Sequence, residues 1–313
     1  MKENGPESLG AGRYEVIEPV GSGGMAVVYR ARDQWLQREV ALKVLTPAGA
    51  RSANTRTRFL QEARTMASLD HPHVVRVLDV GRDGQTYFLA MELAVGGSIS
   101  SYIKAFGTRP TRESLSLIYQ VLLGLGYAHD AGLVHRDIKP QNLLLTHGLN
   151  PEADAKAELF SPRQQVKLAD FGIAKHLHAA EQKRLTGAGD TLGTLAYMAP
   201  EQRADPRDAR PETDIYGVGA SLYIMATGRS PFDLAIADID PTGVQRLPRA
   251  LREVVTRATA ERPEDRFGSA KEMGEAVANA WDEVGPDAEG VSSTASEAAG
   301  ITIAVPLDDD ETE

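Results

Sequence analysis

Ten consecutive residues near the middle of the chain carry three groups able to act on one substrate. Positions 133–142 read LVHRDIKPQN, which brings Asp137, Lys139 and Asn142 close together. Pro140 interrupts any helix here, so the stretch is predicted to be a loop. A carboxylate can take a proton from a hydroxyl, an ammonium can hold a phosphoryl group, and an amide oxygen can ligate a hard divalent cation. An ordinary salt-bridged loop can have the same composition. The other motifs of the chain are therefore needed to distinguish a catalytic loop from a structural one.

Two opposite charges upstream stand in apolar surroundings. Lys43 lies in the middle of a hydrophobic run predicted to be a strand over 40–45, and Glu62 lies on the apolar stripe of a helix predicted over 56–69. Each charge is costly to bury without a partner, so we expect the two to pair with each other. The alternative is that both sit at the rim of the core with their charged ends in water.

A glycine-rich stretch lies earlier still. It reads GSGGMA from Gly21 to Ala26 and is flanked by expected strands on both sides. Glycines let backbone N–H groups approach phosphate oxygens, although simple hairpin turns use the same residues. No helix is expected to follow, which argues against a dinucleotide fingerprint or a Walker loop.

A carboxylate follows a later alternating run. Positions 166–169 read VKLA and lead into Asp170-Phe-Gly, so Asp170 is expected at the end of a strand, where it could reach a bound metal. A lone Asp-Phe-Gly is a common turn sequence. The order Asp137, Asn142, Asp170 is a much stronger signal.

Composition narrows the class of protein. The chain has 313 residues, 42% of them hydrophobic and 25% charged, which is typical of a soluble globular protein large enough for two lobes. It has no cysteine, which excludes disulfides, thiolate metal sites and a thiol nucleophile. No apolar run approaches the length of a membrane helix, and the start lacks the apolar core of a signal peptide. We therefore expect a cytoplasmic protein without a membrane span.

The negative charge is concentrated at one end. Eight acids and no Lys or Arg lie in 284–313, which leaves −2 of the formal charge of −10 for the rest of the chain. This end is predicted to be a disordered acidic tail. The near-neutral remainder gives no indication of nucleic-acid binding.

The order of elements indicates an α+β fold. Five strands with one helix are expected up to about position 92, and mostly helices afterwards, including a long one starting at Thr111 and an apolar one over 214–228. Together the motifs resemble the protein kinase superfamily, specifically the bacterial eukaryotic-like (Hanks-type) serine/threonine kinases. Seven motifs occur in the family's order: GSGGMAVV, VALK, the helix Glu62, HRDIKPQN, DFG, APE and Arg266.

The resemblance implies a bilobal fold with a small antiparallel sheet and one main helix in the N-lobe and a larger, mostly helical C-lobe. The implied divisions are a flexible N-terminus at 1–12, a kinase domain at 13–283 with lobes at 13–93 and 94–283, and the tail at 284–313.

The resemblance also implies a role for each matching residue. The resemblance implies catalytic roles for Asp137, Lys139, Lys43 and Glu62, and metal binding for Asn142 and Asp170. It implies structural or substrate-loop roles for Thr194, Glu201, Asp214 and Arg266. ATP binding is implied for Val20, Gly21, Ser22, Gly23, Gly24, Val28, Ala41, Lys43, Glu92, Ala94 and Leu144.

The implied reaction is transfer of the ATP γ-phosphoryl group to Ser or Thr hydroxyls of proteins, including the kinase itself, with Mg²⁺ (Mn²⁺ as the alternative). Transient dimerisation for autophosphorylation in trans is compatible with this. Arg136 before the aspartate is typical of kinases whose activation loop is ordered by phosphate. Thr186 and Thr191 are the candidate phosphosites, and the alternative for each is a solvated loop residue. Thr194 is interpreted as a partner of the catalytic loop, the alternative being a phosphosite.

Three features depart from the family pattern. Ala26 replaces the third loop glycine, the gap between Asn142 and Asp170 is longer than usual, and the stretch 232–249 is short. The surplus, at about 147–164, is expected to be a surface loop, and the short stretch puts the usual helix there in doubt. A pseudokinase would lack Lys43, Asp137 or Asp170, and all are present. A small-molecule kinase of related fold would lack the APE motif and the late arginine.

Overall fold

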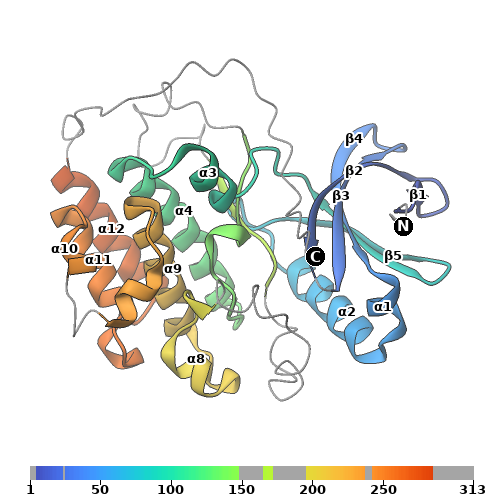
Figure 1. Cartoon of the computed structure of the whole chain (residues 1–313). Helices are drawn as coiled ribbons and strands as arrows, with labels where there is room; N and C mark the ends of the chain where they lie inside the picture. Colours follow the sequence, from blue (N-terminus) through green and yellow to red (C-terminus); the bar gives the residue numbers. More distant parts are fainter. Residues whose placement is uncertain (1–4, 24, 148–164, 172–194, 237–241, 285–313) are drawn as a thin grey trace, which may run out of the picture. The chain divides into compact units, whose positions relative to one another are not determined.

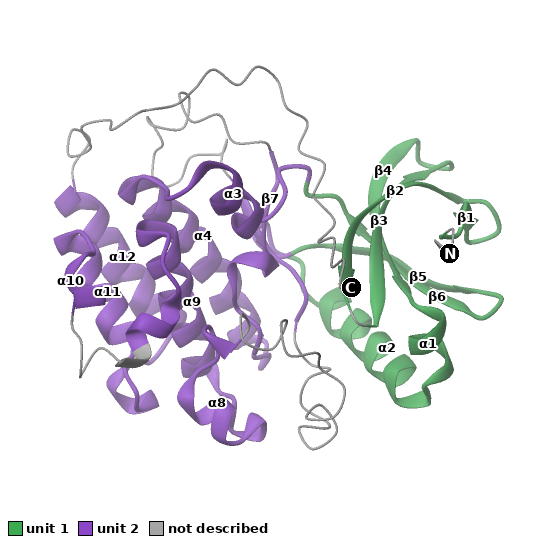
Figure 2. Cartoon of the chain, viewed as in Figure 1, with its two compact units in different colours: residues 1–70, 75–94, 298–313 green, residues 71–74, 95–297 purple. Residues whose placement is uncertain are grey.

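The structure is a computed structural model that describes residues 5–23, 25–147, 165–171, 195–236 and 242–284. These residues form two compact units (Figure 2). The first holds described residues up to Asp70 and from Val75 to Ala94. The second holds His71–Val74 and the described residues from Val95 onward. The short loop at 71–74 belongs to the second unit because the His73 carbonyl accepts the N–H of Leu168 at 2.9 Å.

The first unit is built on one antiparallel sheet (Figure 1). Its core gathers the inward-facing side chains of the strands, including Tyr14, Leu42 and Phe88. In spatial order the strands are β1 (Ser8–Leu9), β2 (Tyr14–Gly23), β3 (Ala26–Asp33), β4 (Arg38–Leu45), β6 (Thr86–Glu92) and β5 (Val77–Asp83).

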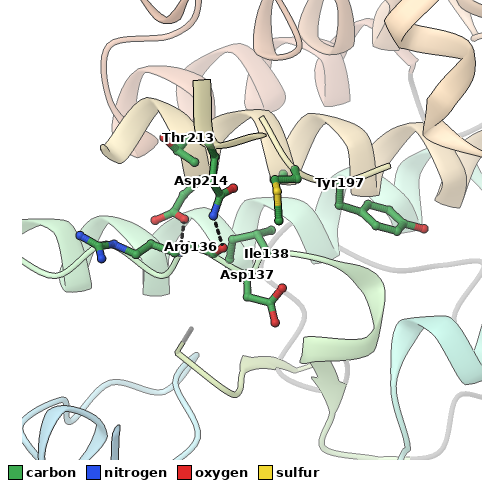
Figure 3. A pocket seen from close by; sticks show the side chains of 9 residues that line it. Arg136, Asp137, Ile138, Tyr197, Thr213 and Asp214 are labelled. Carbon is green, nitrogen blue, oxygen red and sulfur yellow. Dashed lines mark hydrogen bonds between the residues drawn. The ribbon is translucent and has the colours of Figure 1, made fainter. Parts of the chain in front are cut away.

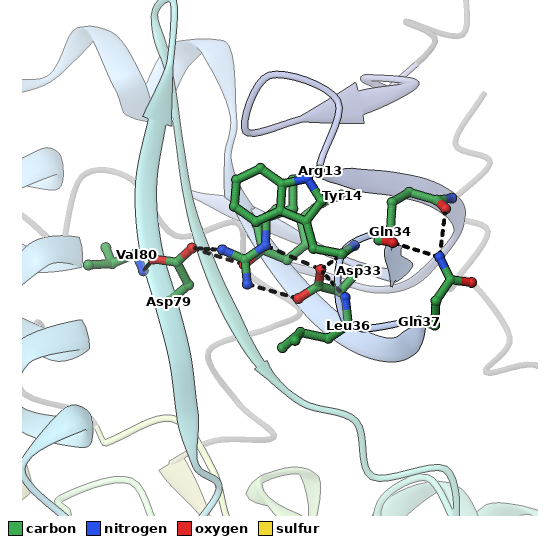
Figure 4. Close-up of polar contacts among 9 residues, drawn as sticks. Arg13, Tyr14, Asp33, Gln34, Leu36, Gln37, Asp79 and Val80 are labelled. Atoms are coloured by element: carbon green, nitrogen blue, oxygen red, sulfur yellow. Dashed lines mark hydrogen bonds and ion pairs between the residues drawn. The ribbon is translucent and has the colours of Figure 1, made fainter.

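A charged network joins three of these strands (Figure 4). The Arg13 guanidinium lies 2.9 Å from Asp33 and 3.0 Å from Asp79, and the Tyr14 hydroxyl donates to Asp79 at 2.9 Å. The Trp35 ring packs 4.8 Å from the same guanidinium. The start of β2 is thereby tied to the end of β3 and to β5.

Two helices complete the first unit. Thr46 caps α1 (Pro47–Arg51) and Ser52 caps α2 (Ala53–Ala67), each by accepting a backbone N–H. The expected count of five strands and one helix was therefore too low by β1 and α1. Both elements are very short. β1 lies within residues 1–12, which were expected to be flexible, but it pairs with β2 and its Leu9 side chain is buried.

The second unit is mostly helical. Its main helices are α3 (Ile99–Phe106), α4 (Thr111–Asp130), α9 (Pro211–Thr227), α11 (Arg249–Ala258) and α12 (Ala270–Val284). The shorter elements are η1 (Pro140–Asn142), β7 (Leu143–Leu145), β8 (Val166–Leu168), α8 (Pro200–Ala204), η3 (Pro206–Asp208), η4 (Pro231–Ile236), α10 (Thr242–Gln245) and η5 (Pro263–Asp265). The four-residue α10 and the six-residue 3-10 helix η4 lie where the sequence put the usual helix in doubt.

Helix α9 is buried nearly all round, as its apolar sequence predicts. It packs so closely on its neighbours that two glycines are required. A Cβ at Gly217 would meet the backbone oxygen of Ile138 at 2.8 Å, and a Cβ at Gly219 would meet Ala258 at 2.6 Å. Gly217 therefore contacts the loop that carries Asp137, whereas Gly219 contacts α11.

Candidate active site

The first unit holds the expected lysine–glutamate pair. Lys43 in β4 and Glu62 in α2 lie 2.8 Å apart, Nζ to Oε1, and their side chains are 12% and 9% exposed. The pair was predicted because neither charge could be buried alone, and that prediction is confirmed. Its low exposure gives the two side chains a fixed geometry, which a flexible surface pair would lack.

The glycine-rich stretch forms the expected hairpin. Val20 to Gly23 end β2, Gly21 pairs with Val28 of β3, and Gly23 pairs with Ala26. No helix follows, as predicted. Ala26 in place of glycine is buried within the strand and keeps the pairing. Gly24 lies outside the described residues.

The remaining residues implied to bind ATP lie in strands or, for Ala94, two residues after one. In the first unit Ala41 is buried in β4, while Glu92 ends β6 and its N–H donates to the Arg76 carbonyl at 3.0 Å. Ala94 ends the same unit. In the second unit Leu144 lies in β7, half-buried, and pairs with Lys167 of β8.

The second unit brings the catalytic-loop groups together. The Asn142 amide nitrogen donates to the backbone oxygen of Asp137 at 2.8 Å and to its carboxylate Oδ2 at 3.0 Å. The Lys139 ammonium lies 3.4 Å from the same Oδ2. Because the amide nitrogen faces Asp137, the amide oxygen of Asn142 is turned away from it.

Asp170 is held beside this loop by the backbone. The N–H of Ala169 donates to the backbone carbonyl of Asn142 at 2.9 Å. This bond holds the next residue, Asp170, close to the catalytic loop. Asp170 also has φ of +55°, a left-handed conformation that is unusual for a residue other than glycine. An amide oxygen and a carboxylate are the hard donors that Mg²⁺ takes, usually with waters and substrate phosphates completing its shell. The donors of Asn142 and Asp170 therefore fit such an ion.

Asp214 anchors the catalytic loop from α9. Its Oδ2 accepts the His135 N–H at 2.8 Å and its Oδ1 accepts the Arg136 N–H at 2.6 Å. Gln202 of α8 holds the other side of the loop by donating to the Arg136 carbonyl at 2.8 Å. Figure 3 shows both Arg136 bonds in the small pocket that also contains Tyr197 and Thr213.

His135 is neutral and its tautomer follows from its contacts. Its Nε2 lies 3.0 Å from the Ala169 carbonyl and must donate, while its Nδ1 accepts the Asp137 N–H at 3.3 Å. Burial lowers the pKa of the imidazole, and the carboxylates of Asp214 and Asp137 only partly offset this. The centroid of the His135 ring lies 4.4 Å from that of the Phe171 ring, so the histidine joins the catalytic loop to the segment that follows β8.

The expected pair of Glu201 and Arg266 is present in the second unit. Arg266 makes two parallel bonds of 2.8 Å to the carboxylate of Glu201 in α8, and Thr213 adds a third at 2.9 Å. Burial raises the pKa of the Glu201 carboxyl, but the bonds from Arg266 and Thr213 outweigh it and the net shift is downward. Thr186, Thr191 and Thr194 lie outside the described residues, as do 148–164 and the acidic tail from 285 onward.

Two contacts at this site were not predicted. Gln202 donates to the Arg136 carbonyl in the catalytic loop, and His129 bonds to Asp214, which anchors that loop. Nothing in the periodicity of the sequence marks either residue. His129 stands in the last turn of α4 and Asp214 in the first turn of α9, 85 positions apart.

The pH dependence of stability follows from His135. We expect the free energy of unfolding to fall between about pH 7.5 and about pH 5.5, since the unfolded chain takes up a proton near pH 6.5 that the buried ring does not. The loss from His135 alone should be about 1 kcal/mol. His71 and His73, whose pKa values burial also lowers, act in the same direction. Denaturant unfolding at both pH values measures this. The exposed His147→Gln variant should keep the same dependence, and stability that rises on acidification would contradict the assignment.

The close contact at Gly217 gives a second test. Gly217→Ala should push Ile138 away from α9 and lower kcat about tenfold, because a small displacement of a catalytic group is expensive. Gly219→Ala is the matched control, since its new methyl group would press on α11 and not on the loop. It should lower thermal stability while leaving kcat per folded molecule near that of the wild type. Equal kcat values for the two variants would contradict the prediction.

Comparison with known proteins identifies the class. Residues 14–277 match the protein kinase domain family, so the chain belongs to that family. It is 39% identical over 274 residues to the serine/threonine-protein kinase PknL of Mycobacterium tuberculosis, covering 84% of this chain and 64% of PknL. It is 34% identical over 284 residues to the serine/threonine-protein kinase PrkC of Bacillus subtilis, covering 87% of this chain and 41% of PrkC.

A solved structure agrees with the fold. The crystal structure of the Mycobacterium tuberculosis PknI kinase domain superposes with a TM-score of 0.61 at 28% identity, covering 86% of this chain and 96% of that one. The chain is therefore a bacterial Hanks-type serine/threonine kinase domain with the expected α+β fold. It spans between two fifths and two thirds of the length of PrkC and PknL.

Proposed function

We propose that this protein is a serine/threonine protein kinase that transfers the γ-phosphoryl group of ATP to hydroxyl groups of protein substrates, itself among them. One arrangement carries the proposal. The side-chain amide nitrogen of Asn142 donates to Asp137, so its amide oxygen faces away from Asp137. The backbone carbonyl of Asn142 accepts the N–H of Ala169, the residue before Asp170. A base and two hard metal donors are thus joined through one residue.

The chemistry follows from these side chains. Asp137 accepts or steers the proton of the substrate hydroxyl, and Lys139, 3.4 Å from it, offsets charge on the phosphoryl group. Lys43 holds the nucleotide phosphates, and Glu62 fixes its position. When bound, Mg²⁺ neutralises phosphate charge, and Asn142 and Asp170 are its protein ligands. The transition state is loose, so positioning and charge neutralisation supply most of the rate.

The resemblance to protein kinases also supports proposals for the nucleotide contacts, the domain bounds, the cellular location and the phosphosites. The nucleotide contacts are those of the glycine-rich hairpin, Val28, Ala41, Glu92, Ala94 and Leu144. The kinase domain spans 13–283 and the protein is cytoplasmic. Within the described residues no helix is long and apolar enough to cross a membrane. Thr186 and Thr191 are the proposed phosphosites, and trans-autophosphorylation through a transient dimer is the proposed route.

Radiolabelled transfer tests the proposal. The full chain is incubated with γ-labelled ATP, Mg²⁺ and a generic protein substrate, and the labelled amino acids are identified after hydrolysis. Label is expected on serine or threonine of the substrate and of the kinase, and not with the Lys43→Met variant. Mass spectrometry then places the sites on the kinase. Equal labelling by wild type and variant would overturn the proposal.

A further inference from the structure

A groove of about 310 Å³ runs between two helices of the second unit. The helices α4 and α12 lie side by side (Figure 1). They run antiparallel, because a Cβ at Gly126 would meet Ala270 at 3.8 Å and one at Gly274 would meet the Tyr119 ring at 3.7 Å. These small residues leave a furrow along the contact. It shares no lining residue with the pocket at the catalytic loop.

Apolar side chains line this groove and remain uncovered. Leu123 and Tyr127 stand four apart on the same face of α4, and they are 40% and 39% exposed. The His71 ring stacks on the Tyr127 ring with centroids 5.1 Å apart, which holds the aromatic wall in place. Exposed charges, among them Lys271 and Glu275, stand at the rim. An apolar hollow with charges at its edge fits an apolar, uncharged segment.

The chain itself carries such a segment within its acidic tail. Residues 301–307 read ITIAVPL, and the acids begin only at Asp308. Large aliphatic residues occupy every second position, and Thr, Ala or Pro the positions between. The four aliphatic residues are Ile301, Ile303, Val305 and Leu307. Strict alternation indicates an extended segment with one apolar face, and that face is covered only by docking on an apolar surface.

The lengths of groove and segment agree. The lining covers residues 119–130 of α4, about 16 Å of helix, and seven residues in extended conformation span about 20 Å. The tail begins after Val284, about 15 Å along α12 from Gly274. A random-coil chain as long as 285–300 spans about 22 Å, so 301–307 can reach the groove. A segment tethered in this way has an effective concentration in the millimolar range, which favours it over a second copy at micromolar concentration.

We propose that residues 301–307 dock as an extended segment in the groove between α4 and α12. The four aliphatic side chains face Leu123 and Tyr127, and the acids from Asp308 onward lie beyond the end of the groove. The contact includes no residue assigned to phosphoryl transfer, so it does not depend on the proposed function. Docking of the segment on a second copy, or its addition as a strand beside β5, are the competing outcomes.

Disulfide trapping in the full chain tests the proposal. The chain has no cysteine, so any disulfide joins two introduced residues. Ala304→Cys keeps the four aliphatic residues, and it is combined with Glu275→Cys or Lys271→Cys at the rim, one turn of helix apart. With a mild oxidant, one of these pairs should close at least about tenfold faster than Ala304→Cys with Arg249→Cys. Arg249 is 93% exposed and lies 3.9 Å from Glu283, so random motion of the tail reaches it easily.

Two further variants separate the alternatives. Adding Ile303→Asp, which puts a charge on the apolar face, should remove the difference in rate. Ala304→Cys with Val80→Cys, at an exposed position of β5, reports addition to the sheet. Non-reducing gels at two protein concentrations distinguish closure within one chain from linkage between two. The proposal is overturned if neither rim pair exceeds the Arg249 pair, if the Val80 pair closes fastest, if Ile303→Asp has no effect, or if linked dimers predominate.

Discussion

Asp137→Asn should abolish nearly all phosphoryl transfer while leaving ATP binding intact. The amide of asparagine cannot take a proton from a substrate hydroxyl, and general base catalysis contributes about 10²–10⁴ to a rate. The carboxylate also accepts Asn142 at 3.0 Å and lies 3.4 Å from Lys139, so the substitution changes the charge that the ammonium meets. We expect kcat to fall by about 10²–10⁴ with the KM for ATP changed by only a few-fold.

Single-turnover transfer from labelled ATP measures this loss, and calorimetry with an ATP analogue measures binding. Asp130→Asn is a suitable control, because it makes the same chemical change at an exposed position in α4. A kcat within tenfold of the wild type would mean that Asp137 is not the base. Loss of ATP binding in the Asn variant would mean that its main effect is structural.

Local physical constraints explain which parts of the site were predictable. Lys43 and Glu62 were matched because each would be costly to bury alone, and the two were the charges that stood in apolar patterns. Asp170 was placed by alternation, which ends a strand at Leu168 in the structure as well. These predictions depended on the period of the apolar residues, two in a strand and 3.6 in a helix. For Lys43 and Glu62 they also depended on the cost of burying an unpaired charge.

Contacts between distant segments were not predictable in this way. His129 meets Asp214 because α4 and α9 pack together, and no local pattern encodes that packing. Gln202 likewise reaches Arg136 only because α8 is placed against the loop. The role of Asp214 is implied by the resemblance, and in the structure its carboxylate accepts two backbone N–H groups of the catalytic loop. The very short elements β1 and α1 were missed, because a few residues give no period to detect.

Arg266→Met should be the most destabilising of the substitutions considered for the second unit. The Arg266 side chain is completely buried, and Glu201 is 13% exposed. Besides the two bonds to Glu201, the guanidinium donates to the carbonyls of Ala260, Glu212 and Glu261 at 2.8–3.0 Å. Removing one partner of a buried pair leaves the other charge uncompensated, which costs about 3–5 kcal/mol. For a domain of this size, that corresponds to a fall in Tm of roughly 10 °C.

Arg262→Met provides the comparison within the same segment. Arg262 also pairs with a carboxylate, that of Asp265 at 2.8 Å, but its side chain is 68% exposed. Solvent screens such a pair, so its loss should cost less than about 1 kcal/mol. Denaturant unfolding of both variants separates the two cases. If the Arg266 and Arg262 variants lose stability equally, the buried pair does not hold α8 to the segment before α12, and the placement of Gln202 under the catalytic loop needs another cause. If only the Arg266 variant is destabilised and its kcat per folded molecule also falls, the pair supports the loop through Gln202 as well as the fold.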